Sequence, residues 1–319
     1  MKKFLALCLA LAMVFALCAC GSSSSSGTNL TFTTGGDQGT YYGFGSVIGE
    51  QVSSNTGTKI SSVTSTGSKA NIEEMDAGNA ALGFVQSDVM AYAYNGERLF
   101  EKAVDSFSVV AALYMEQVQI VTLNPDIKTV ADLKGKAVSI GAAGSGVYYN
   151  AMDIMNLYGL EENVDFKATY QSFDESAESL KDGNIDAFFC VAGAPTPAVV
   201  DLAASKTMYL VSLDEEHIDQ LLETYPSYIA FTIPADTYGL AEDCTTVAVG
   251  AVIIASNDVA DVDVYNFLYG VFENLDALAE IHAKANELSL EFASSFVGVP
   301  YHAGAVQYFA DKGIEVPAE

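Results

Sequence analysis

The sequence predicts an α/β protein built from two α/β lobes, which are joined by a two-strand hinge and leave a ligand cleft between them. Two observations favour this class. From Leu30 onward, short β-rich runs alternate with amphipathic helical stretches, which is typical of parallel strands connected by right-handed crossovers. Two extended apolar runs, 107–122 and 245–255, are longer than usual strands, the first about twofold. Such runs are expected of strands that leave one lobe and continue into the other.

Each lobe is expected to have its own alternation of strands and helices. The first block has expected strands at 30–34, 59–63 and 81–85, and expected helices at 40–53 and 70–78. The second block has expected strands at 137–140 and 185–190, and expected helices at 147–158, 174–181 and 198–205. Three further helices, 264–282, 286–296 and 303–312, are expected mostly to return to the first lobe. The predicted division is therefore 30–115 plus 246–319 for lobe 1 and 116–245 for lobe 2.

The N-terminus has the features of an export signal. Two lysines precede an uncharged apolar run, 4–16, which is too short to span a membrane. The run leads into Leu17-Cys-Ala-Cys20, which resembles the bacterial lipobox, and a Gly/Ser tether that can swing freely follows. This predicts a leader at 1–19 and an anchor and tether at 20–29, with Cys20 lipidated on the outer face of the cytoplasmic membrane. The alternative is an ordinary cleaved signal that leaves Cys20 unmodified.

The charge of the chain excludes one class of partner. The sequence has 41 acidic and 14 basic residues, and the part from Cys20 onward keeps 12 of the basic ones, for a net charge of −29. Such a surface repels nucleic acid, and it also repels an anionic membrane surface. Half of the residues are hydrophobic, so the chain is not a disordered acidic tail. About 290 residues follow the leader and tether, enough for two modest domains.

Cysteine and histidine give no sign of a metal or cofactor. Beyond Cys20 the predicted mature chain has Cys190 and Cys244, which are 54 positions apart. A disulfide between them is compatible with export, but spacing does not establish it, and two buried free thiols are the favoured interpretation. The three histidines, His217, His282 and His302, have no metal-ligand spacing. We therefore expect no bound metal and no cofactor.

Four predicted strand-to-helix junctions are rich in glycine and small hydroxyl residues: 34–42, 64–68, 141–148 and 192–196. Open α/β sheets bind ligands at such junctions, where glycine lets the backbone approach a ligand and helix starts offer free N–H groups. These groups bind anions without a cationic side chain, which matters because Arg98 is the only arginine. The alternative for any one junction is a tight turn that only caps a helix.

Two further sets of polar residues are candidates for the cleft. Gln86 and Ser87 follow a predicted strand and could offer an amide and a hydroxyl to a ligand. The alternative is that they only cap the helix that begins at Asp88. Tyrosine combines an apolar body with a polar tip and therefore suits a cleft wall. The candidate walls are Tyr41, Tyr42, Tyr148 and Tyr149, of which two could be core aromatics.

These positions resemble the TAXI family of TRAP-transporter solute receptors. The matching segments, in chain order, are Gly39-Thr-Tyr-Tyr42, Thr66-Gly-Ser-Lys-Ala-Asn71, Ala80-Ala-Leu-Gly-Phe-Val-Gln-Ser-Asp88, Leu133-Lys-Gly-Lys-Ala-Val-Ser-Ile-Gly141, Gly144-Ser-Gly146, Leu180-Lys-Asp-Gly-Asn-Ile-Asp-Ala-Phe-Phe189, Ala192-Gly-Ala-Pro-Thr-Pro197, Ile233-Pro-Ala-Asp-Thr-Tyr238 and Pro300-Tyr-His-Ala-Gly-Ala305. The resemblance runs from about Leu30 to the C-terminus. No single segment is specific, but the ordered set is. The sequence departs from the family around His302, where the family commonly has Leu and Pro.

The resemblance implies a type II periplasmic-binding-protein fold that closes around its ligand. It also implies delivery of a glutamate-like amino acid or another small carboxylate to a TRAP membrane permease driven by an ion gradient. We expect the receptor to be a monomer. The candidate ligand-binding residues are Gly36, Thr40, Tyr41, Tyr42, Ser65, Thr66, Ser68, Gln86, Gly144, Ser145, Gly146, Ala192, Gly193 and Pro195.

The sequence gives little support to an enzyme, while two other classes of binding or surface protein stay open. Gly144-Ser145-Gly146 lacks the spacing of a nucleophile elbow, and nothing in the sequence brings His302 to Cys190, so no catalytic residue is predicted. A receptor of the same fold could instead serve an ATP-driven importer or a sensor. A surface lipoprotein without transport is a third class, and it would show no stabilisation by ligand.

Overall fold

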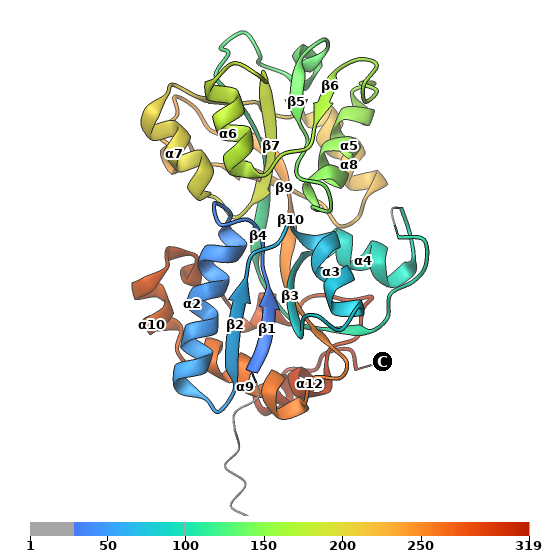
Figure 1. Cartoon of the computed structure of the whole chain (residues 1–319), viewed down its shortest axis with the longest axis vertical. Helices are drawn as coiled ribbons and strands as arrows, with labels where there is room; N and C mark the ends of the chain where they lie inside the picture. Colours follow the sequence, from blue (N-terminus) through green and yellow to red (C-terminus); the bar gives the residue numbers. More distant parts are fainter. Residues whose placement is uncertain (1–28, 99, 319) are drawn as a thin grey trace, which may run out of the picture.

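A mixed sheet of ten strands runs through the part of the chain that the computed structural model describes, residues 29–98 and 100–318 (Figure 1). Eight strands follow the order β2-β1-β3-β10-β4-β7-β5-β6, while β8 pairs with β4 and β9 pairs with β10. The two ends of the sheet form two lobes. We call the end with β1–β3 lobe 1 and the end with β5–β7 lobe 2. The predicted leader and Cys20 lie outside the described residues, among which no helix is long and apolar enough to cross a bilayer.

Lobe 1 is a parallel βαβαβ unit. Its strands are β1 (Asn29–Thr33), β2 (Lys59–Val63) and β3 (Leu82–Gln86), and its helices are α2 (Thr40–Asn55), α3 (Ser68–Asp76) and α4 (Ser87–Asn95). β1 pairs with both β2 and β3 in parallel. β2 alternates exposed and half-buried residues, whereas β3 is buried throughout because it lies between two other strands.

Lobe 2 repeats the alternation. Its strands are β5 (Ala137–Ser139), β6 (Lys167–Thr169), β7 (Ala187–Ala192), β8 (Tyr209–Leu210) and β9 (Ile229–Ile233). Its helices are α5 (Val147–Leu157), α6 (Phe173–Lys181), α7 (Pro197–Ser205), α8 (Glu215–Thr224), and the 3-10 turns η1 (Val130–Leu133) and η2 (Ala235–Thr237). Within lobe 2, β5 pairs in parallel with both β6 and β7.

Two long strands pass through both lobes, as the apolar runs predict. β4 (Phe107–Thr122) and β10 (Cys244–Ser256) are antiparallel neighbours along most of their length. At one end β10 pairs with β3, and at the other it pairs with β9. β4 pairs with β7 only from Gln117 onward. Both strands therefore change neighbours next to Glu116 and Val249, which face each other in the register.

The C-terminal region packs on lobe 1, but its helices are shorter than predicted (Figure 1). It contains α9 (Asp261–Phe272), α10 (Leu275–Ile281), η3 (Ala283–Glu287), α11 (Leu290–Ala293) and α12 (Ala303–Asp311). The predicted helix 264–282 is interrupted at Asn274, whose side chain donates to the carbonyl of Gly270. The predicted helix 286–296 is reduced to one turn, because Ser294 and Ser295 bond back to nearby carbonyls and end it.

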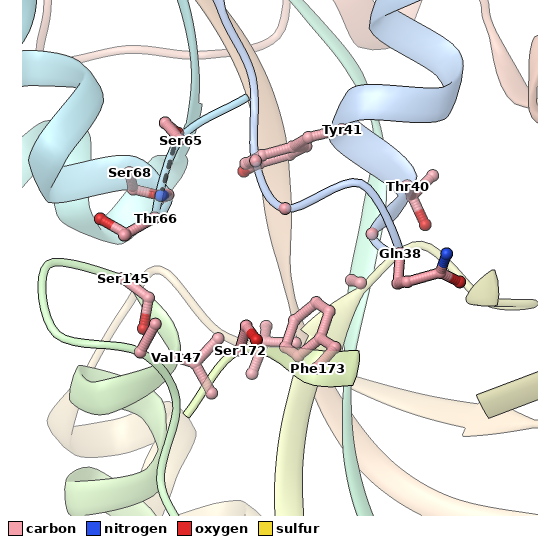
Figure 2. Close-up of a pocket in the computed structure, with 18 of the residues that line it drawn as sticks. Gln38, Thr40, Tyr41, Ser65, Thr66, Ser68, Ser145, Val147, Ser172 and Phe173 are labelled. Carbon is pink, nitrogen blue, oxygen red and sulfur yellow. Dashed lines mark hydrogen bonds between the residues drawn. The ribbon is translucent and has the colours of Figure 1, made fainter. Parts of the chain in front are cut away.

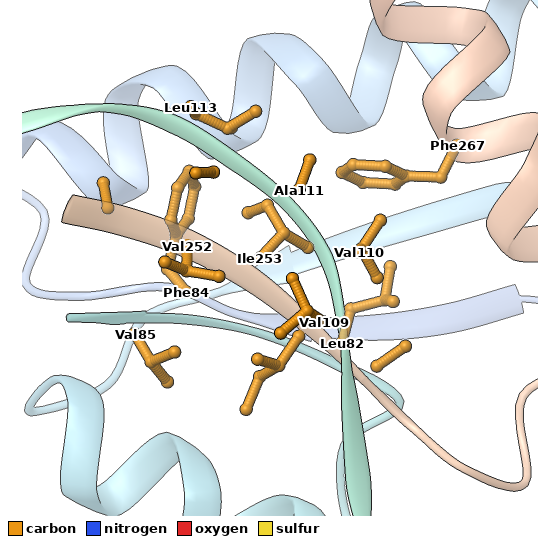
Figure 3. Close-up of a cluster of buried hydrophobic side chains, with 14 of the residues drawn as sticks. Leu82, Phe84, Val85, Val109, Val110, Ala111, Leu113, Val252, Ile253 and Phe267 are labelled. Carbon is orange, nitrogen blue, oxygen red and sulfur yellow. The ribbon is translucent and has the colours of Figure 1, made fainter. Parts of the chain in front are cut away.

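The hydrophobic core of lobe 1 is formed where β3, β4 and β10 meet α2 and α9 (Figure 3). Phe84 is fully buried at its centre, stacked on Phe32 at 5.2 Å and on Tyr41 at 4.5 Å between ring centroids. Lobe 2 has separate clusters on the two faces of its sheet. Tyr149 is an exception, since it belongs to α5 of lobe 2 and yet packs in the lobe 1 cluster.

Both described cysteines are free and buried, which confirms the interpretation that the sequence favours. Cys190 lies in β7 and Cys244 begins β10. Burial raises the pKa of both thiols, that of Cys244 to about 11, so neither forms the reactive thiolate near neutral pH.

We expect a thiol reagent to leave the folded chain from Gly27 onward unlabelled and to label two thiols per chain after denaturation. The physical reason is that burial blocks access to both sulfurs and keeps them protonated. Ser54→Cys adds an exposed thiol on α2 and serves as the positive control, which should react in the folded state. Fewer than two reactive thiols after denaturation without reductant would show a disulfide and contradict the structure.

Candidate functional site

A cavity of about 680 Å³, including the part open to solvent, lies between the two lobes (Figure 2). Its walls are the ends of strands and the starts of the helices that follow them, from both lobes. Open α/β sheets bind ligands at such junctions. The cavity is therefore the candidate binding site, in the cleft that the sequence predicts.

Lobe 1 contributes two glycine-containing loops to the cavity. The loop 35–39 leads into α2, and the loop 65–68 leads into α3. The N-cap residues of these helices are Gly39 and Gly67, and neither helix start has a side-chain cap. Gly67 has a φ of 120°, a conformation that other residues rarely adopt. The N–H groups of residues 40–42 in α2, and those of Ser68 and Lys69 in α3, have no partner among the described residues and are free to bind a ligand, whereas Ala70 already donates to the carbonyl of Gly144.

Lobe 2 contributes the start of α5 to the opposite wall. Gly146 is the N-cap of this helix, again without a side-chain cap. Ser145, next to it, is only 6 % exposed, and its Oγ has no hydrogen-bond partner among the described residues. Ser145 and Val147 both line the cavity (Figure 2). An unpartnered buried hydroxyl beside free helix N–H groups is a set of donors suited to an anion.

The segment between β6 and α6 completes the lobe 2 wall. Ser172, Phe173 and Asp174 line the cavity, and the ring of Phe173 lies on its lower side in Figure 2. Ser172 accepts from the N–H of Glu175 in a capping box, so this helix start is already capped. The segment therefore supplies shape and an aromatic surface rather than free N–H groups.

A buried carboxyl group also lines the cavity. Glu116 in β4 lines the cavity, is 1 % exposed, and accepts a 2.7 Å hydrogen bond at Oε2 from the hydroxyl of Tyr41. Burial raises the pKa of Glu116 to about 8, since desolvation disfavours the carboxylate. Of the described residues that line the cavity, none is a lysine, an arginine or a histidine.

The two lobes are in contact on one side of the cavity through an ion pair. Arg98 of lobe 1 forms a bidentate pair with Asp153 on α5, at 2.6 and 3.0 Å. The Asp153 side chain is fully buried, and the guanidinium lies 4.9 Å from the ring centre of Tyr92 and 5.0 Å from that of Tyr149. A bidentate, stacked arginine is a strong and geometrically specific link between surfaces.

A hydrogen-bond network joins this ion pair to the cavity. Gln86, which lines the cavity, donates from Nε2 to Oδ1 of Asn150 on α5 at 2.7 Å. Asn150 donates in turn to Asp88 and to the hydroxyl of Tyr228, and Tyr228 donates to Asp153. The cavity and the ion pair are thus connected through buried polar groups of both lobes.

The other side of the cavity is also closed by contacts between lobes. Thr40 donates to the carbonyl of Gly193 at 2.7 Å, and the N–H of Ala198 donates to the carbonyl of Gln38. Lys284 of η3 donates to the carbonyl of Ala194 at 2.7 Å. The two lobes are therefore in contact on both sides of the cavity.

The structure brings ten of the fourteen predicted ligand-binding residues around the cavity: Gly36, Thr40, Tyr41, Ser65, Thr66, Ser68, Gln86, Ser145, Gly146 and Ala192. The other four do not line it. Tyr42 is half-buried on α2, and Gly193 receives the bond from Thr40. Gly144 accepts from the N–H of Ala70, and Pro195 follows a cis peptide bond. Of the candidate wall tyrosines, only Tyr41 lines the cavity, while Tyr149 packs in the lobe 1 core.

Two parts of the cavity lining were not predicted from the sequence. Glu116 is the only charged residue in β4, and a single acidic residue inside a long apolar strand is a signal that could have identified it. The Ser172–Asp174 segment occupies a further strand-to-helix junction, but it contains no glycine and therefore did not share the pattern of the other four.

Comparison with known proteins identifies the family. A model of the NMT1-like family matches residues 32–313. The chain belongs to the NMT1-like family. The finer resemblance to TAXI receptors stays a prediction. Within the described ranges, no group of three or more His, Cys, Asp or Glu side chains is placed to hold a metal ion.

Solved structures of solute-binding proteins share the fold of this NMT1-like protein. MatC from Rhodopseudomonas palustris, solved with bound malate, matches with a TM-score of 0.57 and 14 % identity over 82 % of this chain and 90 % of its own. The alkanesulfonate-binding protein SsuA from Xanthomonas axonopodis pv. citri, bound to MOPS, has a TM-score of 0.51 and 15 % identity over 91 % and 92 %. The GluR0 ligand-binding core with L-glutamate has a TM-score of 0.51 and 11 % identity over 84 % and 100 %. The predicted two-lobed α/β fold of periplasmic binding proteins is thereby confirmed.

We expect Gly146→Ala to weaken ligand binding about 5- to 150-fold, because the added methyl group would lie 1.4 Å from Oε1 of Gln86 and displace this side chain from its bond to Asn150, which joins the lobes. Calorimetric titration with a small molecule that binds the parent protein measures the effect. Small-angle scattering with that molecule at saturation should show a larger radius of gyration than the parent has.

Gly57→Ala is the matched control, since nothing lies within 4 Å of the methyl group that it would add. It should leave both affinity and compaction unchanged. Parent-like affinity in the Gly146→Ala protein would show that binding does not require the contact between Gly146 and Gln86.

Proposed function

We propose that this chain is an extracytoplasmic solute receptor of a TRAP-type transporter, which binds a small organic anion and delivers it to a membrane permease. The observation that carries the proposal is the cavity, because both lobes present helix starts without side-chain caps to one space. Such helix starts bind a carboxylate without any basic side chain. Glutamate-like amino acids and other small carboxylates are the proposed cargo.

The contacts around the cavity favour binding over catalysis. Its hydroxyl groups have no histidine among the described lining residues that could activate them as nucleophiles. The fold is shared with solute-binding proteins, and the names of several of these include a small acid or sulfonate. The proposed leader at 1–19 and the lipidated Cys20 would place the receptor on the outer face of the cytoplasmic membrane, in the cell-surface or periplasmic space.

The proposed mechanism is closure of the lobes around the ligand. We propose lobe boundaries at 115/116 and 245/246. The first lies where β4 changes neighbours, whereas β10 changes its neighbour a few residues after the second, next to Val249. The ligand favours the closed state only to the extent that it binds this state more tightly than the open one. N–H groups from α2 and α3 of lobe 1 and α5 of lobe 2 are brought to one space only when the lobes meet, which supplies that difference.

A receptor for an ATP-driven importer, or one that presents its ligand to a sensor, is the second candidate, since the same two-lobed fold serves these systems. Uptake into membrane vesicles that contain a candidate permease separates the two. Receptor-dependent uptake driven by an ion gradient without ATP supports the TRAP proposal, and a strict requirement for ATP contradicts it.

A panel of amino acids and small organic acids should contain one or two compounds that raise the thermal unfolding midpoint by several degrees. A ligand at a hundred times its dissociation constant adds about 2.7 kcal/mol to the free energy of unfolding. The protein, from Gly27 onward, is refolded first to remove bound compounds. A flat panel after verified refolding would count against a receptor for these classes of ligand.

Arg98→Lys should lower ligand affinity about 5- to 30-fold, mainly through faster dissociation, because lysine keeps the charge but loses the bidentate contact with Asp153. Stopped-flow and calorimetric measurements on the best ligand of the panel test this. Lys102→Gln is the control, since Lys102 is 80 % exposed in a 3.9 Å pair and should have no effect. An unchanged dissociation rate in the Arg98→Lys protein would mean that the ion pair does not hold the lobes together.

A further inference from the structure

Glu116 differs from every other polar residue of the shared strands. It is the only charged residue in β4, and β10 has none. Its carboxyl group lies where both strands change neighbours, and it lines the cavity at 1 % exposure. A small molecule that fills the cavity beside β4 therefore contacts this group.

Among the described residues, no cation is free to pair with this carboxyl. Its hydrogen-bond partner there is the hydroxyl of Tyr41, a neutral group. Lys284 acts on it electrostatically, but its Nζ is already bound to Glu287 at 2.6 Å and to the carbonyl of Ala194 at 2.7 Å. Burying a carboxylate without a cationic partner is costly, and here the cost appears as the raised pKa of Glu116. A buried, perturbed carboxyl group that faces a cavity is a candidate ligand contact.

The cavity therefore has two kinds of polar lining. At the helix starts it offers the N–H groups of Ser68 and Gly146 together with the unpartnered hydroxyl of Ser145, whereas the N–H of Gly67 already donates to Oγ of Ser65. From β4 it offers the carboxyl of Glu116. The first set suits a carboxylate, and the second suits a cation.

From this arrangement we infer that the cargo carries an ammonium group which pairs with Glu116, so that it is an amino acid and not the hydroxy or deaminated acid of the same shape. The inference rests on the proposed function, since it needs a small acid in this cavity. It adds the chemical class of that acid and names the residue that selects it.

Asp174 is the other carboxylate in the lining, and it is a weaker candidate. It is exposed in the first turn of α6, where its charge is favoured by the helix start and screened by water. An ammonium group would gain little there, whereas pairing with Glu116 takes place away from solvent.

The test uses three matched pairs of probes: L-glutamate and L-2-hydroxyglutarate, L-aspartate and L-malate, and L-alanine and L-lactate. Each pair differs only by an ammonium group in place of a hydroxyl. We expect the amino member of at least one pair to bind the chain from Gly27 onward. Its hydroxy partner should bind at least about 30-fold more weakly, the effect of removing one partner of a buried charge pair.

Glu116→Gln keeps the shape of the side chain and removes its charge. It should lower affinity for the amino member at least about 30-fold and leave the hydroxy partner unchanged or improved. Glu223→Gln, an exposed change of the same kind on α8, is the matched control for binding. Asp174→Asn tests the competing carboxylate, and loss of amino-acid selectivity in that variant alone would overturn the assignment to Glu116.

Proton release gives a readout that needs no variant. The folded protein without ligand holds a proton on Glu116 at pH 7, because the pKa of this group is raised to about 8. Pairing with an ammonium group ionises Glu116, so about one proton should be released per ligand bound at pH 7. The other titratable groups that face Glu116 are Tyr41, Tyr114, Asp88, Lys284 and Cys190. Calorimetry in buffers of different ionisation enthalpy measures the release, which Glu116→Gln should abolish.

The outcomes separate this inference from the proposed function. Equal or tighter binding of a hydroxy acid, or parent-like affinity in the Glu116→Gln protein, would overturn the inference while the receptor function stands. Absence of binding by all six probes and by the wider panel would overturn both.

Discussion

The pairing of β4 with β10 is the constraint on which the rest of the structure depends. These two strands run through both lobes, so they join the paired strands β1–β3 of lobe 1 and β5–β7 of lobe 2 into one sheet. β10 exchanges β3 for β9 next to Val249, and β4 gains β7 directly after Glu116, so the lobes are joined mainly through these two strands. The cavity lies at this crossing, with the carboxyl ends of strands from both lobes around it.

The hydrogen bonds between the lobes couple the cavity to the ion pair between Arg98 and Asp153. The chain of hydrogen bonds from Gln86 through Asn150 and Tyr228 to Asp153 contains groups from both lobes and is buried throughout. Partial breakage would leave polar atoms without partners away from water, which is costly. The network therefore favours two states, fully made or fully open, over intermediate ones.

Much of this architecture could be predicted from the sequence because it follows from local pattern. The runs of β2 and β4 match their strands to the residue, since apolar and β-branched residues mark both. The glycine loops were located because glycine is required where a chain turns tightly into a helix beside a ligand. The broken helices near Asn274 and Ser294 could not be predicted in the same way, since a side chain that bonds to a nearby carbonyl leaves the helical periodicity intact.

The candidate site was less predictable than the fold, and for a clear physical reason. Contacts such as Arg98 with Asp153 join residues 55 positions apart, and no periodicity reports which surfaces of two lobes meet. The sequence does not show a partner for Arg98, because that partner, Asp153, belongs to the other lobe. Glu116 was not identified because a single charged residue hardly changes the apolar pattern that predicts a strand. A buried carboxylate nevertheless needs a hydrogen-bond donor or a cation as its partner.

A cavity lined without any basic side chain, in a chain whose charges are mostly acidic, has a consequence for the rate of ligand capture. A dianion approaching this protein moves against a repulsive field, so its encounter is slowed at low ionic strength and speeded by salt. A zwitterion has no net charge and meets little of this barrier. The overall acidity of the surface therefore acts as a kinetic filter, which discriminates among small acids before any of them reaches the cavity.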